Sequence, residues 1–384
     1  MRIGVTTFGG DGGKSGISRY IINLLAEFAR IGGAHEFEVL LYEDEQEIFL
    51  PDPPGFMRPL AFPGSFRRPL RNVLWHQTRL GNVCRKRGYD VLFLPAANRR
   101  APAFCPVPTA GTVHDFSSIH VQGKYDASRM FYIKKVLPFL ARRLTRVLTV
   151  SESSKQDIVQ YARVPAERVT VTPLAADSSV YHPSDPGAAR QRICAKYKIT
   201  PPYVLYTSRL EHPGKNHVAL IQAFAEMKKR TGLPHQLVLV GSDWMGAEDV
   251  HRVAEESPFA SEIIFTGFAA TADLPDLYLG ADLFVFPSLY EGFGLPVLEA
   301  MSCGVPVACS NVSSLPEVAG DAGVLFDPAD CASIAAAMEK LLASKEAWTA
   351  AREKGLARAA QFNWEATARA TLAVIEEAAR EGRK

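Results

Sequence analysis

The feature that most constrains the fold of this 384-residue chain is the repeated alternation of short apolar runs with longer amphipathic stretches. The apolar runs are rich in β-branched and aromatic residues, as is typical of strands buried on both faces of a sheet. Strands that alternate with helices predict parallel, doubly wound sheets. The predicted strands span residues 2–6, 37–42, 91–94, 109–113, 146–150, 169–172, 203–207, 237–240, 263–265, 283–286, 305–309 and 323–326.

The alternation starts afresh after a linker rich in Pro, Gly and Asp at residues 181–187. The sequence therefore predicts an α/β protein with two Rossmann-like domains, at residues 1–182 and 188–363, and a final helix near 364–384. The clearest helical periodicity has apolar residues at three- and four-residue steps from Ile17 to Phe28. In open α/β sheets, ligands bind beyond the carboxyl ends of the strands, so the residues that follow each strand are the functional candidates.

The composition excludes several classes of protein. The chain is 47% hydrophobic and 22% charged with a formal net charge of +2, which is typical of globular proteins and does not suit a nucleic-acid binder. No apolar run approaches the ~20 residues of a membrane span, and the N-terminus leads directly into a predicted strand without a signal peptide. The six cysteines are scattered with no C-x-x-C pair, which predicts reduced thiols in a cytoplasmic protein.

The small net charge hides an uneven distribution. Through residue 185 there are 24 Lys and Arg against 17 Asp and Glu, and the remainder has 19 against 24. Two segments of the first half, 49–75 and 129–146, combine basic and apolar residues and suit an anionic membrane surface or a lipid-diphosphate acceptor. A core helix with a solvated basic face explains 129–146 equally well. The first segment contains Phe49, Leu50, Phe56, Met57, Leu60, Phe62, Phe66, Arg67, Arg68, Leu70, Arg71 and Trp75, and the second contains Arg129, Phe131, Ile133, Lys134, Lys135, Val136, Leu137, Phe139, Leu140, Arg142, Arg143 and Arg146.

A glycine-rich loop follows the first predicted strand, at residues 9–16. A strand, a glycine loop and a helix in succession predict a cradle for a phosphate or a sugar, with a flexible turn as the alternative. A P-loop is excluded, because G-x-x-x-x-G-K-[ST] ending at Lys14 and Ser15 would need glycine where Phe8 stands.

Two polar residues follow later strands of the first half. His114 comes directly after the strand 109–113 and beside Asp115, a position that favours a ligand contact as much as a structural role. Ser151 follows the strand 146–150, where a helix N-cap explains it as well.

The first strands of the second half are followed by cations and glycines. Arg209 and Lys215 come after the strand 203–207 and offer a bidentate fork and a point charge, which suits a diphosphate. A solvated loop with incidental charges is the alternative. Gly241 and the pair Gly267 and Phe268 follow the next two strands, where the backbone could approach a ligand closely.

The most specific segment is residues 287–301, after the strand 283–286. Glu291 begins a glycine turn, Pro296 stands in the first turn of the following helix, and Glu299 lies on that helix. Two carboxylates around a glycine loop at a helix N-terminus can bind a polyhydroxylated ligand while backbone amides face its phosphates.

These residues resemble the retaining glycosyltransferases of family 4, which have the GT-B fold of two Rossmann-like domains facing each other across a cleft. The resemblance is carried by the E-x7-E pair Glu291 and Glu299, by Arg209 and Lys215, and by His114. Residues 12–16, Ser288 and residues 304–307 also match. It covers essentially the whole chain, is strong in the second half and looser before residue 105, and implies that the final helix packs back onto the first domain.

The resemblance implies a role for each matching residue. Arg209 and Lys215 would bind the donor diphosphate and stabilise the leaving nucleotide, and Glu299 would hold the ribose. Glu291 would contact the donor sugar, and His114 would lie against the sugar that is transferred. The implied catalytic set is His114, Arg209, Lys215 and Glu291, and the implied donor-binding set is Gly13, Gly16, Arg209, Lys215, Gly241, Phe268, Ser288, Glu291, Gly292, Phe293, Gly294, Leu295 and Glu299.

The implied reaction transfers a hexose from a nucleotide sugar with retention, by front-face attack in which a diphosphate oxygen takes the acceptor's proton. No D-x-D sequence occurs, so neither a metal nor another cofactor is expected. Residues 288–328 look most like bacterial mannosyltransferases of polysaccharide or lipid-linked oligosaccharide assembly. This favours GDP-mannose as donor and a glycan or lipid-linked acceptor, with peripheral contact at the inner face of the cell membrane. The alternatives are a UDP-hexose donor, a sugar-nucleotide epimerase, and a binding protein with a degenerate site.

Overall fold

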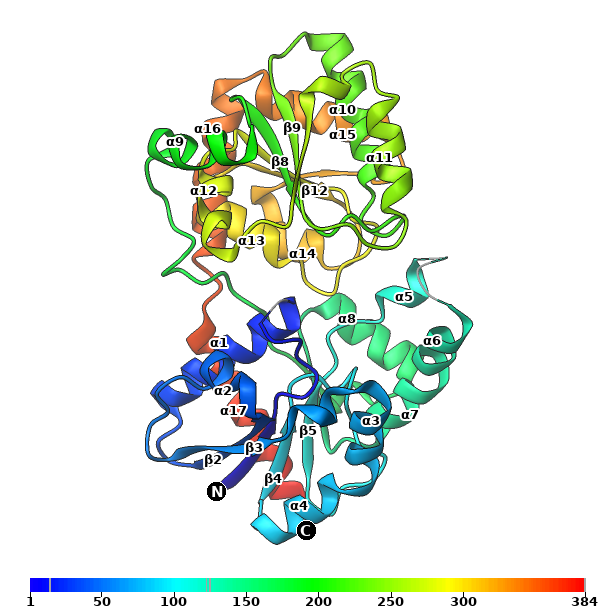
Figure 1. Cartoon of the computed structure of the whole chain (residues 1–384), viewed down its shortest axis with the longest axis vertical. Helices are drawn as coiled ribbons and strands as arrows, with labels where there is room; N and C mark the ends of the chain where they lie inside the picture. Colours follow the sequence, from blue (N-terminus) through cyan, green and yellow to red (C-terminus); the bar gives the residue numbers. More distant parts are fainter. Residues whose placement is uncertain (14, 122, 124–125, 383–384) are drawn as a thin grey trace. The chain divides into compact units, whose positions relative to one another are not determined.

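The computed structural model describes residues 1–13, 15–121, 123 and 126–382, and the chain forms two compact units with one parallel sheet each (Figure 1). The first unit comprises Met1–Ile119, Ala127–Leu174 and the C-terminal segment from Asn363, and the second comprises His120–Asp126 and Ala175–Phe362. The predicted α/β class with two doubly wound sheets is confirmed. The domain limits at 182 and 188 stay a prediction.

The first sheet has seven parallel strands in the order β3-β2-β1-β4-β5-β6-β7. Six of them were predicted from the sequence, and β3 was missed. The strands are β1 (Arg2–Thr6), β2 (Glu36–Tyr42), β3 (Met57–Phe62), β4 (Val91–Leu94), β5 (Thr109–Thr112), β6 (Arg146–Thr149) and β7 (Val169–Val171).

Helices of the first unit include two that pack together, α1 (Gly16–Ile31) and α17 (Trp364–Glu381). Ser15 caps the start of α1, since its side chain accepts a hydrogen bond from the amide of Ser18. The predicted apolar periodicity is confirmed, because Tyr20, Ile21, Leu24, Leu25 and Phe28 form the buried face of α1. The red helix α17 also packs on β4, β5 and β6 (Figure 1). The remaining helices here are α2 (Gln46–Phe49), α3 (Pro69–Thr78), α4 (Leu80–Arg87), α5 (Ser117–His120), α6 (Ala127–Phe131), α7 (Leu137–Arg143) and α8 (Glu152–Asp157).

In each of the two basic segments expected at a surface, residues 49–75 and 129–146, some apolar side chains are buried in the core and others are exposed to solvent. Phe49, Leu50, Met57 and Trp75 are buried in the first segment, whereas Leu70 is 86% exposed. In the second segment Leu137 and Leu140 are buried, Phe131 and Phe139 are exposed, and Arg146 pairs with Glu377 (2.8 Å) and Glu381 of α17. The predicted apolar surface is therefore smaller than the sequence suggested.

The second sheet has six parallel strands in the order β10-β9-β8-β11-β12-β13, all of which were predicted. They are β8 (Tyr203–Thr207), β9 (Gln236–Val240), β10 (Ile263–Gly267), β11 (Leu283–Phe286), β12 (Val307–Ser310) and β13 (Val324–Phe326). The helices are α9 (Pro186–Tyr197), α10 (His217–Thr231), α11 (Ala247–Glu255), α12 (Leu274–Leu279), α13 (Leu295–Ser302), α14 (Leu315–Ala319), α15 (Cys331–Leu342) and α16 (Lys345–Ala359).

Each sheet has one point at which the strand order reverses. In the first sheet the chain runs outward from β1 to β3 and then returns to place β4 on the other side of β1. In the second sheet β8 and β11 have the same relation. Ligands of doubly wound sheets bind at the carboxyl ends of the strands beside such a point. In the part of the chain that the structure describes, no helix has both the length and the apolar character that crossing a membrane requires.

Candidate functional site

Two loops of the second unit leave the sheet at the point where its strand order reverses. Residues 208–216 follow β8, and residues 287–294 follow β11, which pairs with β8. These loops contain seven of the residues predicted for the site: Arg209, Lys215, Ser288, Glu291, Gly292, Phe293 and Gly294.

The structure joins the two loops through an ion pair. The ammonium of Lys215 donates to a carboxylate oxygen of Glu291 over 2.6 Å, and each side chain is about four-fifths buried. The backbone of Lys215 is held from the sheet below, because the Tyr206 hydroxyl donates to its carbonyl oxygen (2.7 Å). Burial raises the pKa of Tyr206, so this hydroxyl keeps its proton at neutral pH. The sequence predicted both charged residues, and the structure places them in direct contact.

Two serines that the sequence analysis gave no role hold the loop of Glu291. The Glu291 amide donates to the Ser313 hydroxyl (3.0 Å). The Ser314 hydroxyl bonds to the carbonyl oxygens of Glu291 (3.0 Å) and Phe293 (2.7 Å). These contacts fix the backbone of the loop from a separate segment, before α14.

Gly294 makes the sharp entrance to α13 possible. Its φ of +102° is a conformation that side-chain-bearing residues rarely adopt, and a Cβ there would lie 2.5 Å from a methyl carbon of Leu315. The helix therefore begins at Leu295 with the amides of its first turn directed toward the loop of Gly292 and Phe293. Such amides and the helix dipole favour an anion.

Glu299 lies on α13 and is held by a buried phenol. The Tyr278 hydroxyl donates to a carboxylate oxygen of Glu299 (2.8 Å) and is also 2.8 Å from the Thr207 hydroxyl at the end of β8. Burial raises the pKa of Tyr278 well above its usual value, so Tyr278 acts as a hydrogen-bond donor. Tyr278 was not recognised in the sequence, because its role depends on a contact between α12 and α13.

Arg209 makes different contacts from Lys215. Its guanidinium carbon lies 4.7 Å from the centroid of the Trp244 ring, and one of its nitrogens is 3.8 Å from a carboxylate oxygen of Glu211. About half of the Arg209 side chain is exposed. Trp244 was not singled out in the sequence, where nothing distinguishes it from other exposed loop residues.

The other predicted donor residues of the second unit differ in accessibility. A Cβ on Gly241 would lie 2.0 Å from the carbonyl oxygen of Ser208, so glycine is required there by the close approach of two loops. Phe268 is exposed after β10, whereas Ser288 is fully buried with its hydroxyl 3.4 Å from that of Tyr206. Ser288 thus anchors the loop of residues 287–294 to the buried Tyr206 of β8.

The glycine loop of the first unit is closed by Asp11. Its carboxylate accepts hydrogen bonds from the Ser18 hydroxyl (2.7 Å) and the Ser15 amide (2.9 Å). Burial would raise the pKa of Asp11, but these hydrogen bonds outweigh it and lower the pKa below its usual value. Gly13 has φ of +88°, and a Cβ on Gly16 would meet open space, so the first turn of α1 is accessible. Lys14 lies outside the described residues.

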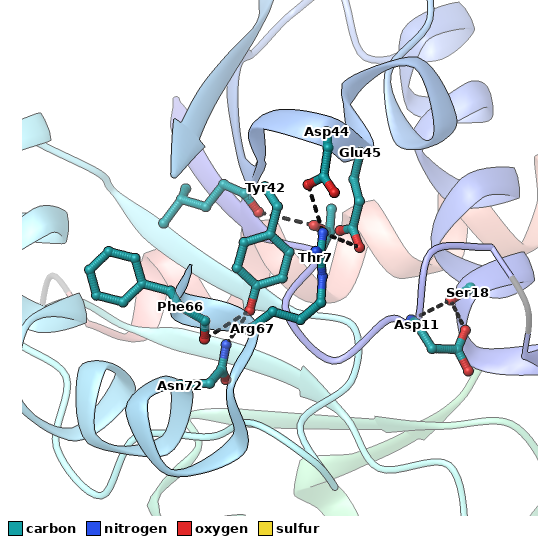
Figure 2. A network of polar contacts seen from close by, with 10 residues as sticks. Thr7, Asp11, Ser18, Tyr42, Asp44, Glu45, Phe66, Arg67 and Asn72 are labelled. Carbon is teal, nitrogen blue, oxygen red and sulfur yellow. Dashed lines mark hydrogen bonds and ion pairs between the residues drawn. The ribbon is translucent and has the colours of Figure 1, made fainter. Parts of the chain in front are cut away.

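A polar network lies beside this glycine loop (Figure 2). Arg67 donates to Asp44 (2.6 Å) and Glu45 (3.3 Å) and stacks over Tyr42, whose hydroxyl bonds to Asn72. Glu45 is almost fully buried, and this burial raises its pKa despite the nearby Arg67. The sequence analysis did not connect these residues, which come from the end of β2, the turn that follows it, the segment after β3, and α3.

His114 is buried at the end of β5. Its Nε2 lies 2.9 Å from the carbonyl oxygen of Pro95, and its ring packs edge-on against Tyr20 at 4.9 Å. Burial lowers the pKa of His114 to about 4, so the ring is neutral at physiological pH. A neutral ring that bonds a carbonyl oxygen carries its proton on Nε2, which leaves Nδ1 as an acceptor.

No group of three or more His, Cys, Asp or Glu side chains suited to a metal ion occurs among the residues that the structure describes.

Comparisons with known proteins assign the chain to a family. Residues 190–358 match the family described as "Glycosyl transferases group 1", and residues 14–180 match "Glycosyltransferase Family 4". O-antigen chain mannosyltransferase B of Escherichia coli is 40% identical over 257 residues, which cover 66% of each chain. Serotype-specific mannosyltransferase WbdA of Escherichia coli is 33% identical over 268 residues, which are 68% of this chain and 32% of WbdA.

The fold is also that of solved glycosyltransferase structures. The Anabaena protein HepE, in complex with UDP-glucose, superposes with a TM-score of 0.73 over 99% of both chains at 20% identity. The present chain spans about two thirds of the first relative and one third of the second. From the two family matches and these likenesses, the chain belongs to glycosyltransferase family 4 and has the GT-B fold.

Proposed function

We propose that this protein is a retaining mannosyltransferase that moves mannose from GDP-mannose to a glycan or lipid-linked saccharide. The observation that carries the proposal is the ion pair of Lys215 and Glu291 at the carboxyl ends of β8 and β11. A cation and a carboxylate lie side by side next to the N-terminus of α13, and this combination suits a ligand that carries both a diphosphate and sugar hydroxyls.

The reaction breaks the bond between the anomeric carbon and a diphosphate oxygen and forms a bond from the same carbon to the acceptor oxygen. Negative charge grows on the departing diphosphate, and Lys215 and Arg209 stabilise it there, as fixed donors do in oxyanion holes. The acceptor's proton passes to the leaving diphosphate oxygen on the same face. Because these cations stand where a divalent ion would otherwise act, we propose that no metal is needed.

The roles of the remaining residues follow from their settings. Glu291 is tied to Lys215, which suits a carboxylate that orients sugar hydroxyls rather than one that attacks the anomeric carbon. Glu299, held by Tyr278, presents its carboxylate to a ribose. Neutral His114 contributes a hydrogen-bond acceptor to the transferred sugar without repelling the oxocarbenium-like centre.

The choice of mannose rests on the relatives, since both that are described above are named as mannosyltransferases. A UDP-hexose is the second candidate donor, because the similarly folded HepE binds UDP-glucose. A sugar-nucleotide epimerase would use the same donor contacts but would release a rearranged sugar nucleotide without any acceptor.

A thermal-shift panel of GDP, UDP and ADP, followed by a donor-hydrolysis screen with the matching sugar nucleotides, tests this proposal. At a ligand concentration of about 100 Kd, binding adds roughly 2.7 kcal/mol, enough to raise the Tm by several degrees. We expect GDP to give the largest shift and GDP-mannose to be hydrolysed slowly to free mannose. Stabilisation by UDP alone would overturn the GDP assignment, and an epimerised sugar nucleotide would overturn the transferase assignment.

We also propose that the first unit contacts an anionic membrane through α3, at a surface formed by Leu70, Val73, Leu74, Arg68 and Arg71. Leu70 is 86% exposed and Leu74 62%, and they recur on one side of the helix at the spacing of helical neighbours. Residues 64–88 contain seven Lys or Arg and no Asp or Glu. Apolar side chains flanked by cations match the interface of a bilayer with anionic headgroups.

A further inference from the structure

Trp244 lies against Arg209 in a way that the proposed roles do not explain. The residue is 45% exposed, although a tryptophan buries more apolar area than any other side chain when it packs fully. Its ring nevertheless has a guanidinium 4.7 Å from its centroid. This distance lies within the range in which a cation is attracted to the face of an indole.

Backbone hydrogen bonds fix the position of Trp244 relative to Arg209. The Leu210 amide donates to the Ser242 carbonyl (3.0 Å), and the Trp244 amide donates back to the Leu210 carbonyl (3.1 Å). The loop after β9 therefore runs along the loop after β8 as a short extension of the sheet, with Leu210 and Asp243 in a parallel bridge.

Two glycines allow this close pairing. A Cβ on Gly241 would lie 2.0 Å from the Ser208 carbonyl oxygen, and one on Gly246 would lie 2.9 Å from that of His212. Trp244 is thus held between two points at which the loops touch, and its backbone cannot retreat from Arg209 without breaking these contacts.

We propose that Trp244 is a positioning residue that holds the guanidinium of Arg209 ready for the donor diphosphate. The guanidinium carbon lies over the indole ring, and a guanidinium that contacts an indole through its face can still bind phosphate oxygens with its N–H edge. The inference rests on the proposed function, because it takes Arg209 as a diphosphate ligand.

Glu211 explains why Arg209 needs this support. A carboxylate oxygen of the nearly buried Glu211 is 3.8 Å from a guanidinium nitrogen, longer than a hydrogen bond. Without the indole, the flexible Arg209 side chain can approach Glu211 more closely. Its N–H groups would then bond to the Glu211 carboxylate instead of to a diphosphate. In the structure the guanidinium lies over the indole and beyond hydrogen-bond distance of Glu211, which is the arrangement that the proposed positioning would preserve.

Calorimetric titration of GDP into the wild type and two variants at Trp244 tests the inference. Trp244→Leu removes the aromatic face and is expected to weaken GDP binding roughly three- to tenfold. Trp244→Phe keeps an aromatic face and should bind within about twofold of the wild type. Met245→Ala, which changes the neighbouring exposed apolar residue, is the matched control and should leave binding unchanged.

A double-mutant cycle separates positioning from direct contact with the ligand. In an Arg209→Met background, Trp244→Leu should cause no further loss of GDP affinity. An equal loss in both backgrounds would mean that the indole touches the nucleotide itself, and it would overturn the inference, as would tighter binding by Trp244→Leu. Normal GDP binding by Trp244→Leu refutes the positioning role alone, whereas a wild type that binds none of GDP, UDP and ADP refutes the proposed function as well.

Discussion

Lys215 is the residue on which most of the proposed chemistry depends. In the proposed mechanism it supplies the point charge for the leaving diphosphate, and in the structure it pairs with Glu291, which is mostly buried. Lys215→Met removes both functions at once and leaves the Glu291 carboxylate without this cation, at a cost in stability as well as in rate.

We expect Lys215→Met to lower kcat/KM for donor hydrolysis and transfer by about 10²- to 10³-fold, as loss of one oxyanion-stabilising donor does in other enzymes. Lys229→Met removes an exposed lysine of α10 in the same unit and should leave the rate unchanged. Steady-state kinetics of the purified variants, at a temperature at which unfolding curves show each of them to be folded, provide the measurement. A Lys215→Met rate within threefold of the wild type would contradict the assignment of the site.

Most of the residues that the sequence predicted for the proposed site lie in loops that follow strands, and Glu299 on α13 is an exception. The sequence could identify Arg209, Lys215 and Glu291 because the carboxyl ends of the strands meet at one edge of a parallel sheet. This holds for any arrangement of the surrounding helices and loops. The sequence could not identify Tyr278 and Trp244, because they reach the site through contacts between elements that no local pattern encodes.

At the scale of the element, β3 shows where strand prediction failed. The strand contains Pro59, and proline in the middle of an apolar run argues against a central strand. The structure places β3 at the edge of the sheet, paired with β2 alone, where the missing amide costs nothing if it points away from β2. Only Met57 of β3 is buried, as is typical of a half-covered edge, and this differs from the wholly apolar runs that revealed the central strands.

The helix α3 is the element that decides the membrane proposal. Leu70→Ser combined with Leu74→Ser removes the two most exposed apolar side chains of α3 without touching its buried face, Asn72, Trp75 and His76. Each leucine contributes roughly 1.5–3 kcal/mol when fully buried. We therefore expect the double variant to lose at least tenfold in binding to vesicles that contain anionic lipid.

Co-sedimentation with vesicles at low and high salt measures this loss. Leu325→Ser changes an exposed apolar residue of β13 in the second unit and should sediment like the wild type. Salt should weaken the wild-type interaction, because Arg68 and Arg71 act by screened attraction to headgroups. If the wild type fails to bind anionic vesicles at low salt, the membrane proposal is wrong.

At the scale of the whole molecule, both units bury histidines that are neutral in the folded state at physiological pH. Burial lowers the pKa of His76 and of His114 in the first unit to about 4. In the second unit, burial together with the nearby charges of Lys215 and His212 lowers the pKa of His217 to about 3. The same three rings have a pKa of about 6.5 when the chain is unfolded.

The unfolded chain therefore binds more protons than the folded chain between pH 6.5 and 4, and the free energy of unfolding must fall as the pH falls through this window. Below pH 6.5, each such histidine makes the free energy of unfolding fall by up to about 1.4 kcal/mol per pH unit. Above that pH, its contribution to stability is fully present. Urea unfolding at pH 7.5, 6.5 and 5.5 measures the slope before the carboxylates begin to titrate. Burial also lowers the pKa of His235, so His217→Gln should remove about a quarter of the slope, and His182→Gln, which replaces an exposed histidine, is the matched control. A free energy of unfolding that stays constant from pH 7.5 to 5.5 would mean that these rings take up protons in the folded chain. His114 would then not be neutral in that range, and the proposed contact of His114 with the sugar would be wrong.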